Sequence, residues 1–362
     1  MPRVPSSRLS RRGRSALFWA LAAFAFCQFG MAVAIERAYP QFRDPEFGYR
    51  RNRLMERLTH ASPKPYTAVM LGSSRTTVGF DAGILERQLS EHLQRPAIAF
   101  NFGVTGAGPL THLINLRRLL KDGIRPDLVL IEILPPLLNG QPWNAESLRL
   151  RPERLWHDEV GVLKEYGGLP GMEKRWLTGW PVPFYEHRFP ILSRFMPSWL
   201  PYDMRLDWAL GIDDSGYAPR PKMRRSAAGE QVALENMRKD YSARLTAFQL
   251  GGQACRGLVE LVDLCEREHL AAALVLMPEG SAFRALYTPE VWRQIDGFLQ
   301  GVACRTHIPI LNAREWLPDS AFVDAHHLLQ EGAEAFTSRF ARESVVPLVD
   351  RLTSGSTYVA AP

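Results

Sequence analysis

The stretch Met70-Leu71-Gly72-Ser73-Ser74-Arg75-Thr76 governs how the fold of this chain is interpreted. The apolar run Tyr66–Leu71 stops at a glycine, two serines and an arginine, which is typical of a buried strand that ends in an exposed loop. In α/β sheets the carboxyl ends of the strands are where ligands bind. A turn and a helix N-cap would use the same residue types. A catalytic role for the serine therefore requires a base, an orienting acid and oxyanion donors elsewhere in the chain.

Outward from this stretch, apolar strands alternate with amphipathic helices. Continuous apolar strands separated by such helices indicate a parallel sheet covered on both faces. The sequence therefore predicts an α/β fold with three layers, α/β/α, around a five-stranded parallel sheet. The expected strands are Tyr66–Leu71, Ala97–Phe102, Leu128–Leu134, Ala271–Met277 and Ile308–Asn312. The expected helices are Phe80–His92, Leu110–Lys121, Val232–His269 (with a break at Gly251-Gly252), Pro289–Arg305 and Leu329–Leu352.

The N-terminus has the pattern of a membrane-targeting segment. Residues 1–14 are basic, and Ser15–Ile35 is almost wholly apolar and long enough to cross a bilayer. Positive charge before the span predicts a cytoplasmic N-terminus and an exported remainder. The span is expected to be an uncleaved signal anchor, giving a single-pass protein of the cytoplasmic membrane with a periplasmic C-terminal domain. The alternative is a signal peptide cleaved after Ala32-Val33-Ala34.

Composition divides the rest of the chain. Residues 36–65 contain four prolines and are predicted to form a linker with one short helix, Arg50–Thr59. Residues 66–352 are predicted to form the α/β domain. Within it, 137–231 is rich in Trp, Pro, Arg and Gly and is expected to be a helical and loop-rich insert. Residues 353–362 are expected to be a disordered tail.

Charge and cysteine content limit the possible partners. The formal net charge is +6, and residues 1–34 hold five arginines and no acid, so the remainder carries only +1. The basic balance is therefore a property of the leader, and no nucleic-acid partner is expected. The four cysteines are too few for a disulfide scaffold, and no Cys/His group has zinc spacing. Neither a metal nor a cofactor is expected.

Candidate catalytic residues lie in three separate loops. Asp324 and His327 have Asp-x-x-His spacing before the last helix, so the acid can hold the imidazole while its other nitrogen faces a cleft. His326 is the rival base, but it is expected to point elsewhere. The backbone N–H groups of Ser74 and Gly106 are expected oxyanion donors, and the Asn101 side chain is a further possible donor.

In this order, Gly72-Ser73-Ser74-Arg75, Asn101-x-Gly103-x-x-Gly106 and Asp324-x-x-His327 resemble the SGNH, or GDSL-like, hydrolase superfamily. The resemblance covers residues 66–134 and 271–345. It implies a flavodoxin-like α/β fold with Ser74 as nucleophile, His327 as base, Asp324 as the orienting acid and Gly106 in the oxyanion hole. Ser73 stands where that family has an aspartate. The asparagine that the family supplies after strand three is absent from Ile131-Glu132-Ile133-Leu134-Pro135-Pro136.

The double serine, the membrane segment and the long insert resemble the anchored branch of that superfamily, which works beside membrane-bound O-acyltransferases in modifying envelope polymers. The resemblance implies an extracytoplasmic serine esterase or O-acyltransferase. Its substrate would be an acylated envelope polysaccharide or a small ester, and its partner a membrane-bound O-acyltransferase. The alternative is a non-catalytic module of the same fold that binds a glycan or scaffolds the acyltransferase. A phosphate-binding loop at Ser73-Ser74-Arg75 is disfavoured because it leaves Asp324 and His327 without a role.

Overall fold

Five parallel strands form the centre of the computed structural model, which describes residues 11–140, 146–166, 171–206, 211–219 and 226–354. The strands follow one another across the sheet in the order β2-β1-β3-β4-β5. This is the flavodoxin-like order, so the predicted α/β fold is confirmed. The strands are β1 Tyr66–Gly72, β2 Ala97–Gly103, β3 Leu128–Glu132, β4 Ala271–Leu276 and β5 Ile310–Asn312.

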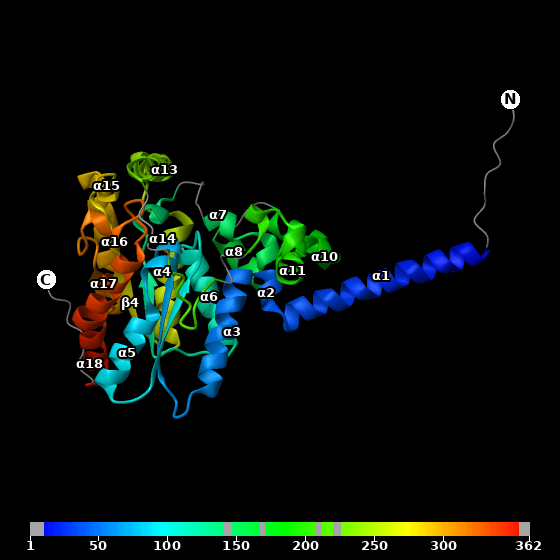
Figure 1. Cartoon of the computed structure of the whole chain (residues 1–362), viewed down its shortest axis with the longest axis horizontal. Coiled ribbons are helices and arrows are strands. Elements are labelled where there is room, and N and C mark those ends of the chain that lie inside the picture. The colour runs from blue at the N-terminus through cyan, green and yellow to red at the C-terminus, as the bar shows by residue number, and fades with distance from the viewer. Residues whose placement is uncertain (1–10, 141–145, 167–170, 207–210, 220–225, 355–362) are drawn as a thin grey trace.

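Successive residues of each strand enter two different cores, because side chains alternate across a sheet. In β1, Val69 and Leu71 join one apolar cluster, whereas Ala68 and Met70 join the other. The first cluster lies under α3 (Pro45–His60), α6 (Pro109–Lys121), α14 (Gly252–Arg267) and α16 (Pro289–Thr306). The second lies under α5 (Ala82–Leu93), α17 (Gln330–Phe340) and α18 (Val346–Thr353). Helices therefore cover both faces of the sheet (Figure 1).

The expected helices are present, with two interruptions. The long helix predicted over 232–269 is two helices, α13 (Ala227–Thr246) and α14, separated by residues 247–251. The break falls at the expected Gly251-Gly252, where both glycines have positive φ and Gly252 begins α14. The last helix is divided by a turn of π-helix, Ala341–Val345, between α17 and α18. Of the predicted tail, 353–362, only Thr353, which ends α18, and Ser354 lie within the described residues.

The segment expected to be a linker, 36–65, contains two helices, α2 (Pro40–Arg43) and α3. Phe47 and Leu54 of α3 are fully buried in the first apolar cluster. The predicted short helix Arg50–Thr59 is the second part of α3. This segment therefore packs on the sheet beside β2 as part of the folded body, which its proline content did not indicate.

The N-terminal helix α1 (Arg11–Arg37) projects away from the body (Figure 1). Its part Gly13–Arg37 contains an 18-residue stretch with a mean hydropathy of 1.9 and is long and apolar enough to cross a membrane. Ala32 and Ile35, near its end, are buried against the body. The part of the chain that the structure describes thus contains one helix of this kind, and it includes the span Ser15–Ile35 expected from the sequence.

The described residues of the insert, 137–231, form mainly short helices, as its composition indicated. They pack beside α2 and the foot of α1 in Figure 1. The α-helices are α7 Glu146–Arg149, α8 His157–Glu165, α9 Met172–Gly179, α10 Pro183–Glu186 and α11 Arg188–Phe195. The 3-10 turns are Pro135–Leu138, Pro152–Arg154, Pro197–Trp199 and Tyr202–Met204. Three further short helices lie elsewhere: α4 Ser74–Gly79, α15 Ser281–Arg284 and a 3-10 turn at Asp319–Ala321.

Candidate active site

Ser74 and His327 meet at the carboxyl edge of the sheet. Ser74 is the first residue of α4, immediately after β1, and His327 lies in the loop that precedes α17. Its Nε2 atom is 2.8 Å from the Ser74 Oγ atom. The two residues are 253 positions apart in the chain, so only the fold brings them together. The distance is within hydrogen-bond range, as a serine and its general base require.

Asp324 holds the imidazole from the other side. Its Oδ2 atom is 2.9 Å from His327 Nδ1, and its Oδ1 atom accepts a hydrogen bond of 2.8 Å from the His327 backbone N–H. Burial would raise the pKa of Asp324, but its hydrogen bonds and charge contacts with His326 and His327 outweigh burial and hold that pKa well below its usual range. An Asp324 that is ionised at neutral pH favours the tautomer with the proton on Nδ1 and leaves Nε2 to accept from Ser74.

His326 does not compete for Ser74. Its ring is stacked on Phe283, with centroids 5.2 Å apart and planes 17° apart, and it meets the edge of Tyr241 at 5.2 Å. The side chain is buried, and its Nδ1 atom lies 3.2 Å from Asp324 Oδ1. The structure therefore gives His326 a packing role beside Asp324, in agreement with the expectation that it points away from the serine.

The same three residues could also hold a metal ion. One ligand atom from each of Asp324, His326 and His327 falls within 4.8 Å of the others. Both ring nitrogens of His327 are already used, however, one by Asp324 and the other by Ser74. A metal bound there would have to displace one of these hydrogen bonds, so the arrangement fits proton transfer better than metal ligation.

Gly106 lies in the loop that follows β2. This loop is joined to the nucleophile loop, because the Val104 N–H donates to the Gly72 carbonyl over 2.8 Å. Gly106 has a φ of +72°, and a Cβ atom there would meet nothing within 4 Å. The residue is therefore required for its backbone conformation and leaves open space beside the chain, which is compatible with the expected donation of its N–H to a substrate.

Asn101 is placed differently from the expectation. Its side-chain amide donates to the backbone carbonyls of Thr76 and Phe80, each over 2.7 Å, and its Oδ1 atom accepts from the Gly103 N–H. The residue is fully buried. These contacts use the amide N–H groups to hold the end of α4 against β2. In this structure Asn101 therefore does not present its side chain to an oxyanion, and we correct the sequence-based assignment of Asn101 as an oxyanion donor.

Glu132 is a site residue that the motifs did not reveal. It ends β3, is buried, and accepts hydrogen bonds from the Ser73 N–H (2.6 Å), the Ser73 hydroxyl (3.0 Å) and the Thr76 hydroxyl (2.6 Å). A Cβ atom on Gly72 would collide with the Thr76 and Glu132 side chains, so glycine is needed there. The only sequence signal was an acid at the end of the apolar run Leu128–Glu132.

A chain of buried charges ties this loop to β4 and β5. Arg75 lies 3.9 Å from Glu132 and 3.5 Å from Glu279, and Glu279 is paired with Arg314 at 2.7 Å. Arg75 also donates to the carbonyls of Met277 and Pro278. Two acids and two arginines balance one another, as buried charges require. These contacts join the loop that carries Ser74 to the loops that follow β4 and β5.

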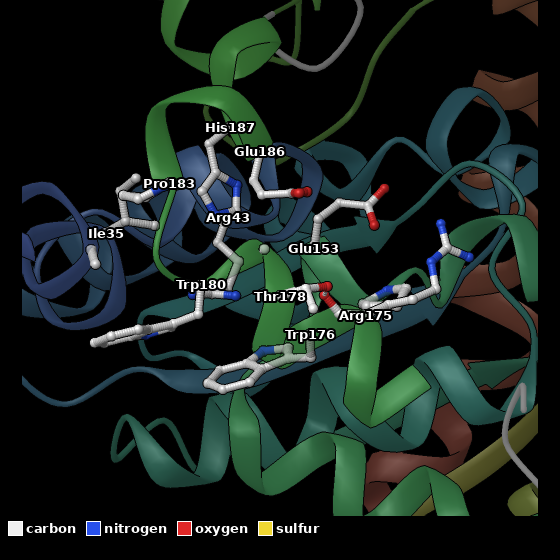
Figure 2. A pocket seen from close by; sticks show the side chains of 13 residues that line it. Ile35, Arg43, Glu153, Arg175, Trp176, Thr178, Trp180, Pro183, Glu186 and His187 are labelled. Atoms are coloured by element: carbon white, nitrogen blue, oxygen red, sulfur yellow. Dashed lines mark hydrogen bonds between the residues drawn. The ribbon is translucent and has the colours of Figure 1, made fainter. Parts of the chain in front are cut away.

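The cavity drawn in Figure 2 lies elsewhere, at the foot of α1. Its volume is about 140 Å³, and its lining comes from α1, α2 and the insert and includes no residue of the Ser74 cluster. Figure 2 shows the rings of Trp176 and Trp180 along one side, with the Glu153 and Glu186 side chains across from them. The catalytic cluster and the cavity are thus separate features of the molecule.

Comparison with known proteins gives limited further information. A family model described as "Protein of unknown function (DUF1574)" matches residues 43–151, which is less than half of the chain. A search of curated protein sequences found no match.

Several solved structures share parts of the architecture, at low scores. They include TesA (11% identity, 77% of this chain and 99% of that chain covered, TM-score 0.37). A catalytic mutant of Axe2, an acetylxylan esterase from Geobacillus stearothermophilus, matches at 11% identity over 77% and 93% of the two chains, with a TM-score of 0.35. A GDSL-like lipase from Bacteroides thetaiotaomicron matches at 10% identity over 84% and 99%, with a TM-score of 0.35. Because these scores are low, the functional conclusion depends on the side chains of this chain.

Proposed function

We propose that this protein is a serine esterase in which Ser74, His327 and Asp324 form a catalytic triad. The observation that carries the proposal is the pair of hydrogen-bond distances, 2.8 Å from Ser74 to His327 and 2.9 Å from His327 to Asp324. A serine hydroxyl is a weak nucleophile until a positioned base removes its proton. This order of groups, with an ionised acid behind the imidazole, supplies that base.

The reaction would proceed through an acyl-enzyme. Ser74 Oγ attacks the carbonyl carbon of an ester while His327 Nε2 takes the serine proton. The backbone N–H groups of Ser74 and Gly106 are the proposed donors to the oxyanion that forms. Collapse of that intermediate breaks the bond to the alcohol, which leaves with the proton from His327. Water, or a hydroxyl of an acceptor, then attacks the acyl-serine with His327 again as base.

Labelling with a fluorophosphonate probe tests the nucleophile, because the probe reacts covalently only with an activated serine. The wild-type chain should be labelled, and Ser74→Ala should lose the label. Ser354→Ala, which removes an exposed serine at the end of the described chain, is the matched control and should label fully. Equal labelling of the wild type and Ser74→Ala would exclude Ser74 as the nucleophile.

The finer proposal is that the enzyme transfers or removes acyl groups on an envelope polysaccharide outside the cytoplasm. It is supported by α1, which is apolar enough to anchor the domain in the cytoplasmic membrane, and by the resemblance to the anchored branch. Hydrolysis and transfer share the acyl-enzyme and differ in the acceptor. Release of acetate from p-nitrophenyl acetate, with and without an added oligosaccharide, separates them: transfer requires the acylated oligosaccharide to appear.

The exposed thiol of Cys304 offers a test of location. A maleimide that cannot cross membranes should label Cys304 in cells in which the outer membrane is permeabilised and the cytoplasmic membrane is intact. Cys304→Ser is the control for labelling of other thiols. Labelling that appears only after the cytoplasmic membrane is lysed would place the domain in the cytoplasm and contradict the periplasmic proposal.

A second candidate function is a non-catalytic envelope module that binds a glycan or scaffolds a membrane-bound O-acyltransferase. It is favoured by one observation, the use of the Asn101 amide within the fold, which leaves the proposed oxyanion site to the backbone N–H groups of Ser74 and Gly106. Under this alternative, Ser74→Ala and His327→Ala would both rescue a deletion phenotype as well as the wild type. Failure of both variants to rescue supports the enzyme.

A further inference from the structure

The exposed apolar side chains of this protein are concentrated in two places. Among the described residues, twenty large apolar side chains are exposed. Seven belong to α1 and ten to the stretch Leu177–Met204 of the insert, whereas only Tyr39, Val232 and Leu352 lie outside these two segments. We define the insert face by its members: Leu177, Trp180, Val182, Phe184, Tyr185, Phe195, Met196, Trp199, Tyr202 and Met204. A patch of this kind on an otherwise polar body marks an interaction surface.

The insert face is continuous with α1. The rings of Phe29 and Trp180 meet edge to face with centroids 6.3 Å apart, and the Phe184 N–H donates to the Gln28 side chain over 3.4 Å. Figure 1 shows α10 and α11 on the side of the body from which α1 projects. Whatever surrounds the exposed part of α1 therefore also reaches the insert face.

The arginines of the leader fix how deep this contact lies. Arg11, Arg12 and Arg14 are excluded from the hydrocarbon core, so the buried part of α1 begins at about residue 15. A core about 30 Å thick takes about 20 helical residues, and it therefore ends close to Ile35. Phe29 is six residues before that end, which is about 9 Å inside the core at 1.5 Å per residue. Trp180, in contact with Phe29, must then lie at the depth to which interfacial helices enter a bilayer, about 5–10 Å.

The residue types fit this depth. Trp and Tyr collect at membrane interfaces because their rings are amphipathic, and the insert face has Trp180, Tyr185, Trp199 and Tyr202. Residues 171–206 hold five basic and three acidic side chains, a balance that suits an anionic lipid surface. The Arg188 guanidinium lies over the ring of Tyr185, 4.0 Å from its centroid, and donates to the Tyr185 carbonyl, so a positive charge is held beside an aromatic ring of the insert face.

We propose that the insert face is a second membrane contact, lying in the headgroup and upper acyl region of the bilayer that α1 crosses. The occupant is lipid. The cavity of Figure 2, lined by Ala32 and Ile35 of α1 together with Trp176 and Trp180 of the insert, lies at the junction of the two contacts. Two contacts at different positions hold the body in one orientation on the membrane. With α1 as the single contact, the body could change its orientation relative to the membrane surface. The proposal does not depend on the esterase activity.

Spin-label accessibility on the full chain tests the proposal. The exposed cysteines Cys27 and Cys304 are first changed to serine, and single cysteines are then introduced by Tyr185→Cys, Trp199→Cys and Tyr202→Cys. The protein is reconstituted into vesicles of phosphatidylethanolamine and phosphatidylglycerol that contain no other protein. Phe24→Cys, in α1, gives the reference for a label in the bilayer. Val232→Cys and Leu352→Cys are matched controls, because they replace exposed apolar side chains outside the insert face.

Spin labels on the insert face should collide more often with oxygen, and less often with a water-soluble nickel chelate, than the labels at the two control positions. Their collision rates should lie between those of the controls and that of the Phe24 reference. All labelled sites are exposed, and circular dichroism checks that each variant is folded. If labels on the insert face have the same collision rates in these vesicles as the labels at Val232 and Leu352, the proposal is overturned. Protection that appears only in native membranes would also overturn it, since it would assign the face to a protein partner.

Discussion

Replacement of Glu132 by glutamine should loosen the loop that carries Ser74. The carboxylate accepts three hydrogen bonds from Ser73 and Thr76, and it faces Arg75 Nε at 3.9 Å. Glutamine keeps one oxygen, which can still accept from the Ser73 N–H and the Thr76 hydroxyl. Its NH₂ group replaces the other oxygen and points a donor toward Arg75. The variant therefore loses one hydrogen bond to a charged group and the negative partner of a buried arginine.

The magnitude follows from these contacts. A hydrogen bond to a charged group is worth about 1.5–3 kcal/mol, and breaking a buried ion pair costs about 3–5 kcal/mol. Arg75 retains Glu279 and two carbonyls, so we expect the free energy of unfolding to fall by roughly 3 kcal/mol. With a urea m-value of about 3 kcal/mol per molar, the midpoint falls by about 1 M. A displacement of the Ser74 hydroxyl of about 1 Å would lower kcat by about 100-fold.

Urea unfolding followed by tryptophan fluorescence and the rate of fluorophosphonate labelling measure the two effects. Thr76→Val is the matched control, because it removes one donor to Glu132 but leaves the charge in place, and it should cost about 1.5 kcal/mol, the value of one hydrogen bond to a charged group. If Glu132→Gln unfolds at the wild-type urea concentration and labels at the wild-type rate, the Glu132 carboxylate does not position the loop.

Three further predictions concern single residues. His327→Ala should lower the rate of acyl-enzyme formation by about 10⁴-fold or more. His326→Ala should cost far less, because its ring packs on Phe283 and contacts Asp324, whereas His327 makes the hydrogen bond to Ser74. Stopped-flow measurement with p-nitrophenyl acetate compares the two variants, and the reverse order would move the base by one residue. Asn101→Ala should lower the unfolding free energy by about 2–4 kcal/mol while kcat per titrated active site stays within about tenfold; a loss of about 10²–10³ in kcat would instead return Asn101 to the oxyanion hole. Burial lowers the pKa of His112 to about 4 from an ordinary value of 6.5. Between these pH values the unfolded chain therefore binds more protons than the folded chain. The free energy of unfolding should fall by about 3 kcal/mol as the pH drops from about 6.5 to 4. His112→Gln should remove this part of the pH dependence, as measured by urea midpoints between about pH 4 and 7, and an unchanged profile would show that His112 is not the group responsible.

The sequence by itself determined the class of fold. Strands such as Leu128–Glu132 are apolar on both faces, because a sheet covered on both sides leaves no strand face in water. Helices such as α6 have one apolar face, which packs on the sheet. These patterns are local, so they can be read one segment at a time. The positions of Ser74, Gly106 and the Asp324–His327 pair at strand ends and helix entries follow from the same local reading.

Only the tertiary structure decided which of these groups act together. The approach of Ser74 to His327 joins segments 253 residues apart, and no local pattern encodes that distance. The same reason explains the two misplaced expectations. In the sequence Asn101 is a possible donor, but in the structure its amide is used by the backbone carbonyls at the end of α4. The segment that forms α3 has the composition of a linker, but in the structure Phe47 and Leu54 are part of the apolar core. Glu132 was an acid at a strand end in the sequence, and the fold alone placed Ser73, Thr76 and Arg75 around it.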